Sequence, residues 1–219
     1  MKITNQTIIV GIIALLIGGV GGYTVADRDM SYGQRHDGKM SENSPMGMHR
    51  MHDNTMMDND DPDMGSMSQM DHMMAMMVDS EREFIEGMIP HHQEAVDTAK
   101  EVIARGGSTP EIKKLVENIV VAQEVEIAEM KNWYEEWFGE KYADNGKYMP
   151  MMRELKNLSG AQLDQVFLED MIGHHMGAIM MAHSVEPYIT HNEITELTEA
   201  IISSQSAEIA QMRKMLQGL

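Results

Sequence analysis

An internal repeat is the feature that most restricts how this chain can fold. Residues 84–95 read FIEGMIPHHQEA, and residues 167–178 read FLEDMIGHHMGA. A second matching pair follows: residues 123–130 read QEVEIAEM, and residues 205–212 read QSAEIAQM. Both halves therefore carry the same two segments in the same order, which indicates a duplicated structural unit.

Each copy has the pattern of a helical hairpin. In the first copy Ser80 and Glu83 form a capping box, and apolar residues then recur at helical spacing until a Gly-Gly pair. Thr109, with Pro110 in the first turn, starts a second helix that continues to about Phe138. Each hairpin has one apolar stripe, and two hairpins bury these stripes against each other as a four-helix bundle.

The predicted fold is therefore all-α, with the bundle in residues 80–219. Its hairpins occupy residues 80–138 and 159–219, and a polar connection joins them. A chain of 219 residues has room for one such domain with appendages. We expect two appendages, residues 1–26 and residues 27–79.

The repeat carries the residues that could bind a metal. Each copy has one methionine and two histidines at relative positions 0, +3 and +4, so the thioether lies one helical turn from both imidazoles. Similarly spaced Glu and Met lie on each partner helix, and the second copy adds Met181 where the first has Thr98. The predicted ligands in the bundle are Met88, His91, His92, Glu126, Met130, Met171, His174, His175, Met181, Glu208 and Met212.

An alternative is that the histidines are ordinary core residues. Buried histidine usually finds a hydrogen-bond partner, here Glu126, Glu208 or the nearby Gln side chains. Both pairs also follow a residue that weakens a helix, Pro90 in one copy and Gly173 in the other. Duplication of this arrangement, together with the methionines, favours metal binding.

Residues 27–79 are rich in Met, Asp and His and have almost no aliphatic residue. They contain 14 of the 26 methionines. Such a segment buries too little branched apolar surface to offset the entropy of ordering, so we expect it to be disordered without a ligand. Its predicted metal ligands are Met48, His49, Met51, His52, His72 and Met73. Scavenging of oxidants by methionine is the rival function for this segment.

The available side chains favour copper. Cysteine is absent, which removes thiolate sites for zinc or iron-sulfur clusters. Thioether sulfur suits Cu(I), imidazole also holds Cu(II), and Ag(I) is expected at the same sulfurs. Zinc would have to rely on histidine and carboxylate, which is a poorer match.

Residues 8–26 are uncharged and follow the basic residue Lys2. They are long enough to span a bilayer as a signal anchor, and Thr24-Val25-Ala26 also suits cleavage of a signal peptide. Both alternatives place the remainder outside a bacterial cytoplasmic membrane, either tethered on the periplasmic side or released there.

Charge and motifs exclude several classes of function. The formal net charge of -18 repels nucleic acid. The sequence has no Glu-x-x-His, which a ferritin-like di-iron oxidase would place on two helices, and no His-Glu-x-x-His. No catalytic motif is found, so we do not expect an enzyme.

The segments at residues 84–99 and 167–182 resemble the His-His signature of the family called domain of unknown function 305, and the resemblance covers residues 80–219. That family is described as ferritin-like and includes copper-binding proteins of the CopM type. The resemblance implies an exported helical bundle with a role in copper binding or resistance. The first copy departs from the second at Thr98, which implies a site poorer in sulfur.

The favoured hypothesis is sequestration of copper, and also of silver, outside the cytoplasmic membrane. Metal ions and the membrane are the expected partners, and a homo-oligomer or a metal exporter remains open. A structural or signalling bundle that binds a protein partner is the main alternative, and a ferritin-like redox enzyme is a further one.

Overall fold

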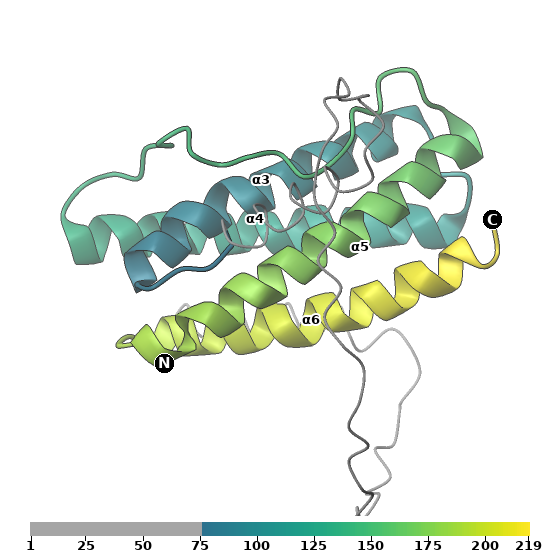
Figure 1. Cartoon of the computed structure of the whole chain (residues 1–219). Coiled ribbons are helices and arrows are strands. Elements are labelled where there is room, and N and C mark those ends of the chain that lie inside the picture. Colours follow the sequence, from purple (N-terminus) through teal and green to yellow (C-terminus); the bar gives the residue numbers. More distant parts are fainter. Residues whose placement is uncertain (1–75) are drawn as a thin grey trace, which may run out of the picture.

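The computed structural model describes residues 76–219, which form an all-helical domain (Figure 1). Within this range there are four long helices, one short 3₁₀ helix and no strand. The elements are α3 (Glu81–Arg105), α4 (Pro110–Phe138), α5 (Gly160–Val185), η1 (Glu186–Tyr188) and α6 (Asn192–Leu216). The prediction of an all-α bundle is confirmed.

The first two helices begin at the residues that the sequence indicates. Ser80 caps α3 by accepting a hydrogen bond from the backbone N–H of Glu83 at 3.2 Å. The Glu83 carboxylate in turn accepts from the backbone N–H of Asp79, one residue earlier than in a capping box. Thr109 caps α4, and Pro110 occupies its first position.

The helices pair as two antiparallel hairpins that meet along one side. α3 packs along α4, α5 packs along α6, and α3 and α5 contact each other across the bundle, whereas α4 and α6 barely touch. The connection at residues 139–159 runs over α3 and α5 on the outside of this contact (Figure 1). One side of the bundle is therefore covered by the connection, and the opposite side is open between α4 and α6.

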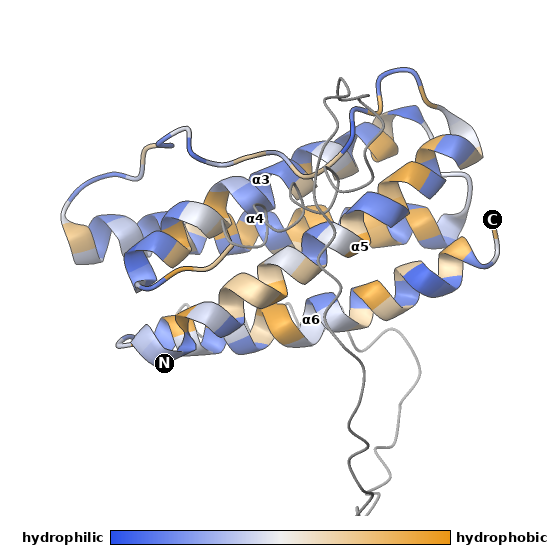
Figure 2. Cartoon of the chain, viewed as in Figure 1, coloured by the Kyte–Doolittle hydropathy of each residue, from blue (hydrophilic) through white to orange (hydrophobic). Residues whose placement is uncertain are grey.

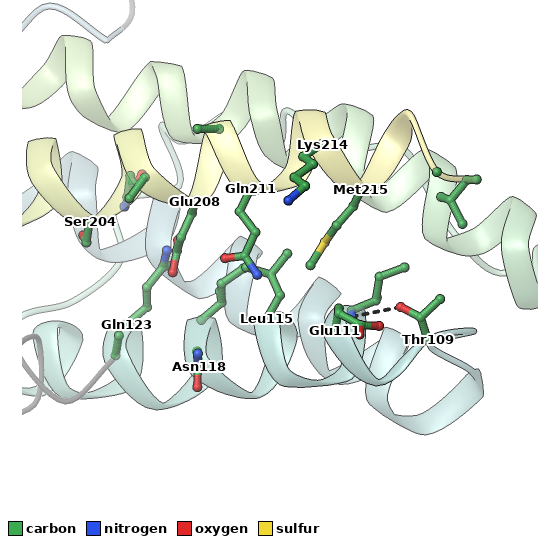
Figure 3. Close-up of a pocket in the computed structure, with 18 of the residues that line it drawn as sticks. Thr109, Glu111, Leu115, Asn118, Gln123, Ser204, Glu208, Gln211, Lys214 and Met215 are labelled. Carbon is green, nitrogen blue, oxygen red and sulfur yellow. Dashed lines mark hydrogen bonds between the residues drawn. The ribbon is translucent and has the colours of Figure 1, made fainter. Parts of the chain in front are cut away.

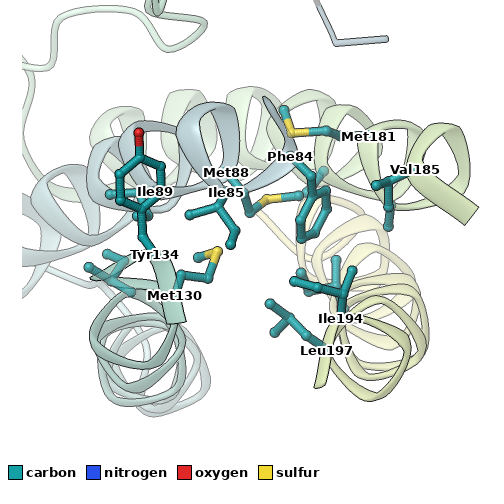
Figure 4. Packing of buried hydrophobic residues seen from close by; sticks show 14 of the residues in the cluster. Phe84, Ile85, Met88, Ile89, Met130, Tyr134, Met181, Val185, Ile194 and Leu197 are labelled. Atoms are coloured by element: carbon teal, nitrogen blue, oxygen red, sulfur yellow. The ribbon is translucent and has the colours of Figure 1, made fainter. Parts of the chain in front are cut away.

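Hydrophobic and polar residues alternate around each helix (Figure 2), and the buried apolar residues form two separate clusters. The first cluster contains Phe84, Met88, Met130, Met181 and Leu197, and Figure 4 shows it from close by. The second cluster contains Leu115, Leu163, Phe167, Met171 and Met212. On α4, α5 and α6 buried polar residues separate the two clusters, and on α3 two buried histidines lie between Ile89 and Ala95, so a polar layer crosses the middle of the bundle.

The ordered domain extends beyond the predicted boundary at Ser80. Met76 is only 4% exposed and belongs to the first apolar cluster, and the backbone N–H of Val78 donates to Ser184 at 3.1 Å. Residues 76–79 therefore pack against the bundle, although they belong to the segment that the sequence analysis assigns outside it.

The predictions for residues 1–75, including the signal anchor or signal peptide, lie outside the described residues. Among residues 76–219, no helix has the length and hydrophobicity that crossing a bilayer requires.

Candidate metal centre

The polar layer, here called the histidine layer, brings both histidine pairs together. Its members are His91, His92, Gln123, Glu126, His174, His175, Gln205 and Glu208. The four histidines are at most 1% exposed. Where α3 and α5 cross, the rings of His91 and His174 lie almost in contact, with centroids 3.7 Å apart. The layer is therefore one site that both hairpins build.

One histidine of each pair bonds to a carboxylate of its own hairpin. The Nε2 atom of His92 lies 2.8 Å from Glu126, and Nε2 of His175 lies 2.6 Å from Glu208. Because a carboxylate accepts, Nε2 carries the hydrogen, and a neutral ring then keeps its lone pair on Nδ1. Both Nδ1 atoms are buried without a hydrogen-bond partner among the described residues. A carboxylate behind an imidazole is also how proteins orient metal-binding histidines.

The second histidine of the α5 pair faces a carboxylate from the other hairpin. Nε2 of His174 lies 3.3 Å from an oxygen of Glu94, a contact too poorly aligned to count as a regular hydrogen bond. Glu94 is itself held by the Tyr148 hydroxyl and by the backbone N–H groups of Met151 and Met152. The connection between the hairpins therefore fixes the carboxylate that faces His174.

His91 is the most isolated member of the histidine layer. Neither of its ring nitrogens has a hydrogen-bond partner among the described residues. A side chain on Gly177 would begin 3.3 Å from Nε2 of His91 and 3.5 Å from the sulfur of Met151. The missing side chain of Gly177 thus lets an imidazole from α3 and a thioether from the connection approach the same point.

Burial keeps the central histidines neutral. Desolvation lowers the pKa of His91 well below its usual value, and the neighbouring His174 lowers it further. Desolvation also lowers the pKa of His174, although Glu94 opposes this shift. Burial alone would raise the pKa of Glu94, but the close contact with His174 and the hydrogen bonds from Tyr148 and the backbone outweigh it, so the carboxyl pKa is lowered. The site thus offers neutral imidazoles beside an ionised carboxylate.

A groove on the open side of the bundle leads to the histidine layer. It lies between α4 and α6, has a volume of about 960 Å³, and is lined by Gln123, Glu126, Gln205 and Glu208 among others. Gln123 and Glu208 point toward each other into this groove (Figure 3). The carboxylates that bond His92 and His175 therefore stand between the buried imidazoles and the outside.

The predicted methionine ligands take different positions. Met88 and Met130 lie in the first apolar cluster, one turn from the histidine layer, and Met171 and Met212 lie correspondingly in the second cluster. Met181 lies in the first cluster, and its sulfur approaches Gly87 of the first hairpin. The predicted ligands of the N-terminal segment, from Met48 to Met73, lie outside the described residues.

Three residues near the histidines were missed by the sequence analysis, namely Glu94, Tyr148 and Met151. The connection has no helical periodicity, so nothing in its pattern shows what it packs against. Its run of methionines at residues 149–152 was the available signal. Within residues 76–219, no three His, Asp or Glu side chains converge as a ready metal cluster, so sulfur or movement of side chains would have to complete a site.

These features define a class of protein: a four-helix bundle with two pairs of buried histidines and nearby thioethers at its centre. The family model named "Domain of unknown function (DUF305)" matches residues 28–134 and 138–216. The chain belongs to this family, which confirms the resemblance inferred from the repeat. No curated protein sequence matches the chain.

Solved structures similar to the chain include CopM in several metal-bound forms. CopM in its Cu(I)-bound form is 41% identical, with a TM-score of 0.57, and the match covers 64% of this chain and 96% of that chain. The Ag-bound form obtained by soaking is 38% identical over 64% and 96% of the two chains, also with a TM-score of 0.57. A DUF305 protein from Streptomyces coelicolor is 27% identical, with a TM-score of 0.57, over 64% of this chain and 93% of that one.

Proposed function

We propose that this protein binds Cu(I) and Ag(I) in the histidine layer and sequesters them outside the cytoplasmic membrane. The observation that carries the proposal is the set of four buried imidazoles, each of which retains at least one ring nitrogen without a hydrogen-bond partner among the described residues. Neutral imidazole is a good ligand for copper, and the thioethers one turn away suit its monovalent state.

Energetics support a ligand at this place. A buried polar atom without a partner costs about 1–3 kcal/mol, and native proteins keep few of them. Here Nδ1 of His92 and His175 and both ring nitrogens of His91 and His174 lie in one layer. A metal ion bound to several of these nitrogens would offset the cost at a single place, whereas a purely structural layer gains nothing from leaving them unpaired.

The relatives support the choice of metal. CopM structures are described with Cu(I), with Cu(II) and with Ag, and the bundle aligns with them over nearly their whole length. The methionine-rich segment and the absence of cysteine point to the same soft ions. An exported location, with residues 1–26 as anchor or signal peptide, is part of the proposal. We propose binding and not turnover, since no catalytic motif accompanies these residues.

A competition titration tests the proposal. The full chain, kept in mild detergent, is titrated with Cu(I) and Ag(I) against a chelator of known affinity. We expect His91→Ala and His174→Ala to weaken the tightest site by at least about tenfold. His183→Ala is the matched control, because His183 is exposed at the end of α5 and bonds only to Glu186. Equal affinities for all three variants and the wild type would refute the proposal.

The groove between α4 and α6 favours a second candidate, a bundle that binds a protein partner there while the histidines merely support the core. Its volume of about 960 Å³ is large enough for side chains of another molecule. The two functions differ in one measurement. Metal that binds the folded state raises the melting temperature, whereas a purely structural layer leaves it unchanged when Ag(I) is added.

A further inference from the structure

A pocket near the start of α3 gathers methionines from three separate parts of the chain. Its volume is about 260 Å³, and Met76, Met77, Met149 and Met181 all line it. Met76 and Met77 precede α3, Met149 belongs to the connection, and Met181 lies on α5. We refer to these four residues as the methionine pocket.

Core packing explains only half of these methionines. Met76 and Met181 are 4% and 2% exposed and fill an irregular gap, which is a common use of methionine. Met77 and Met149 are 61% and 44% exposed, so they have no core to fill. The two exposed thioethers can meet an ion that arrives from water, and the two buried thioethers can then bind it inside the pocket. Thioether sulfur is a ligand that suits soft ions such as Cu(I) and Ag(I).

Two residues that form the pocket, Gly87 and Met181, are not repeated at the equivalent positions of the other copy. The floor of the pocket is Gly87, where a side chain would begin 3.3 Å from the sulfur of Met181. The second copy has Asp170 at the position equivalent to Gly87, and the first copy has Thr98 at the position equivalent to Met181. Asp170 is bonded by Arg153 at 2.8 Å, so a guanidinium lies at the corresponding place. Gly87 therefore lines a sulfur-containing pocket together with Met181, whereas the positively charged side chain of Arg153 lies beside Asp170 in the second copy.

The surroundings of the pocket are suited to a cation. Glu83, Glu86 and Lys147 line it. Arg82 pairs with Glu86 at 3.0 Å, whereas Glu83 has no ion-pair partner among the described residues. Tyr148 lines the pocket as well, its ring lies 5.9 Å from that of His91, and its hydroxyl donates to Glu94. The methionine pocket and the histidine layer thus share one wall.

We propose that the methionine pocket is a second soft-metal site, which takes one Cu(I) or Ag(I) ion through thioether sulfurs at the junction between the methionine-rich segment and the histidine layer. The proposal rests on the proposed function in taking a soft metal as the ligand. Met76 and Met77 are the last two methionines of that segment, so the pocket adjoins the end of the segment along the chain.

Methyl NMR tests the pocket in the full chain, since it resolves each methionine separately from those of the N-terminal segment. The chain, in detergent and with labelled methionine methyl groups, is titrated with Ag(I) in chloride-free buffer. Single Met→Leu variants assign the four methyl signals. We expect these signals to shift together and to saturate at the same amount of Ag(I).

Two variants sharpen the test. Met149→Leu changes an exposed residue, and Met181→Leu conserves volume, so both are expected to fold. Each should weaken the response of the remaining pocket methyl groups to Ag(I) by at least about tenfold. Met215→Leu is the matched control, because Met215 packs against the second apolar cluster, away from the pocket, and should change nothing.

The histidine signals separate this proposal from the proposed function. If the histidine layer binds no metal, its imidazole signals stay unmoved while the pocket methyl groups still shift. If the pocket is not a site, its four methyl groups do not respond at saturating Ag(I), or respond equally in Met149→Leu and wild type, whatever the imidazoles do. Either of the last two results would overturn the methionine pocket.

Discussion

The two hairpins carry the same histidine pair but surround it differently. Both hairpins bond their second histidine to a glutamate of the partner helix, at 2.8 Å in the first and 2.6 Å in the second. Three residues after the first histidine they diverge, with Glu94 in one copy and Gly177 in the other. Glu94 reaches His174, whereas Gly177 makes room for His91.

The difference between Glu94 and Gly177 shows how two copies of one unit can form a single asymmetric site. Because α3 and α5 cross at the histidine layer, each of these positions faces the histidine of the opposite hairpin. One copy supplies a negative charge and the other supplies space that His91 and the sulfur of Met151 share. The repeat provides the framework, and one position per copy makes the two halves of the site chemically distinct.

Placing glutamate at position 177, where the first copy has Glu94, should have the largest effect on stability. Gly177→Glu forces a carboxylate against His91 and Met151, where even the first side-chain atom would already lie 3.3 Å from His91 and 3.5 Å from Met151. We expect a loss of about 3 kcal/mol or more in the free energy of unfolding, since both overpacking and the burial of a charge are costly. Urea denaturation at neutral pH measures it.

The matched control for this change is Gly173→Glu. Gly173 is exposed, and a side chain there meets nothing within 4 Å. The control should therefore leave the midpoint of unfolding almost unchanged. If both variants lose equal stability, the loss comes from replacing a helical glycine with glutamate. Position 177 would then have no special role beside His91.

Neutralising the carboxylate of the first copy should have the next largest effect. Glu94→Gln replaces a charged acceptor that holds Tyr148 and the backbone of Met151 and Met152. Hydrogen bonds to charged groups contribute about 1.5–3 kcal/mol each, so we expect a loss in that range overall. Hydrogen exchange should show faster exchange of the Met151 and Met152 amides.

A surface glutamate provides the control for Glu94. Glu124 forms an exposed ion pair with Lys100, and Glu124→Gln should alter stability little. Unchanged exchange at Met151 and Met152 in Glu94→Gln would show that the connection is held by other contacts.

A second pair of equivalent carboxylates also distinguishes the hairpins. Glu81 accepts four hydrogen bonds from Thr190 and His191 in the loop between α5 and α6. Asp164, at the equivalent position of the second copy, accepts one from the backbone N–H of Ser108 between α3 and α4, and its other oxygen has no partner among the described residues. A carboxylate of each hairpin thus bonds to the loop of the other hairpin, but Glu81 accepts more hydrogen bonds than Asp164 does.

We expect Glu81→Gln to cost about 1–2 kcal/mol at pH 7 and Asp164→Asn to cost less. Burial would raise the pKa of Glu81, but the bonds from Thr190 and His191 outweigh it and lower the pKa. A lowered carboxyl pKa contributes stability above the unfolded value, about 4.3, and this contribution is lost as pH falls through the folded value. The difference between wild type and Glu81→Gln should therefore shrink below about pH 4, as thermal unfolding across pH would show.

Local features made most of the fold predictable from the sequence. Ser80 and Thr109 act within one turn of their own helices, and apolar spacing reports the buried face of each helix directly. The repeat then indicated that two similar hairpins pack against each other. The bonds of His92 to Glu126 and of His175 to Glu208 were within reach because both partners lie inside one hairpin.

The rest of the candidate site depends on contacts between hairpins, which no periodicity encodes. The crossing of α3 and α5 places Glu94 beside His174 and Met181 beside Gly87, and the crossing angle depends on the packing of the whole bundle. Tyr148 and Met151 belong to a connection without regular structure, so their neighbours follow from the tertiary fold alone. Aligning the copies does reveal the unequal positions, but it cannot show what each one faces.

The smallest expected effect concerns the helix-weakening residues, Pro90 and Gly173. Both lie directly before a histidine pair, and both helices continue through them. Gly173→Ala should raise the free energy of unfolding by about 0.5–1 kcal/mol, because alanine restricts the unfolded chain and its side chain meets nothing within 4 Å. Chemical denaturation resolves such a change if the slope of the transition is unaltered.

Gly177→Ala is the control for this last change, since it adds the same methyl group one turn further along, against His91. It should give no stabilisation or a loss, because the neighbours must move to accept it. Opposite signs for the two substitutions would show that Gly173 only weakens the helix while Gly177 holds space for the centre. Equal signs would mean that the histidine layer adapts to a methyl group at Gly177, and the asymmetry of the histidine layer would then rest on Glu94.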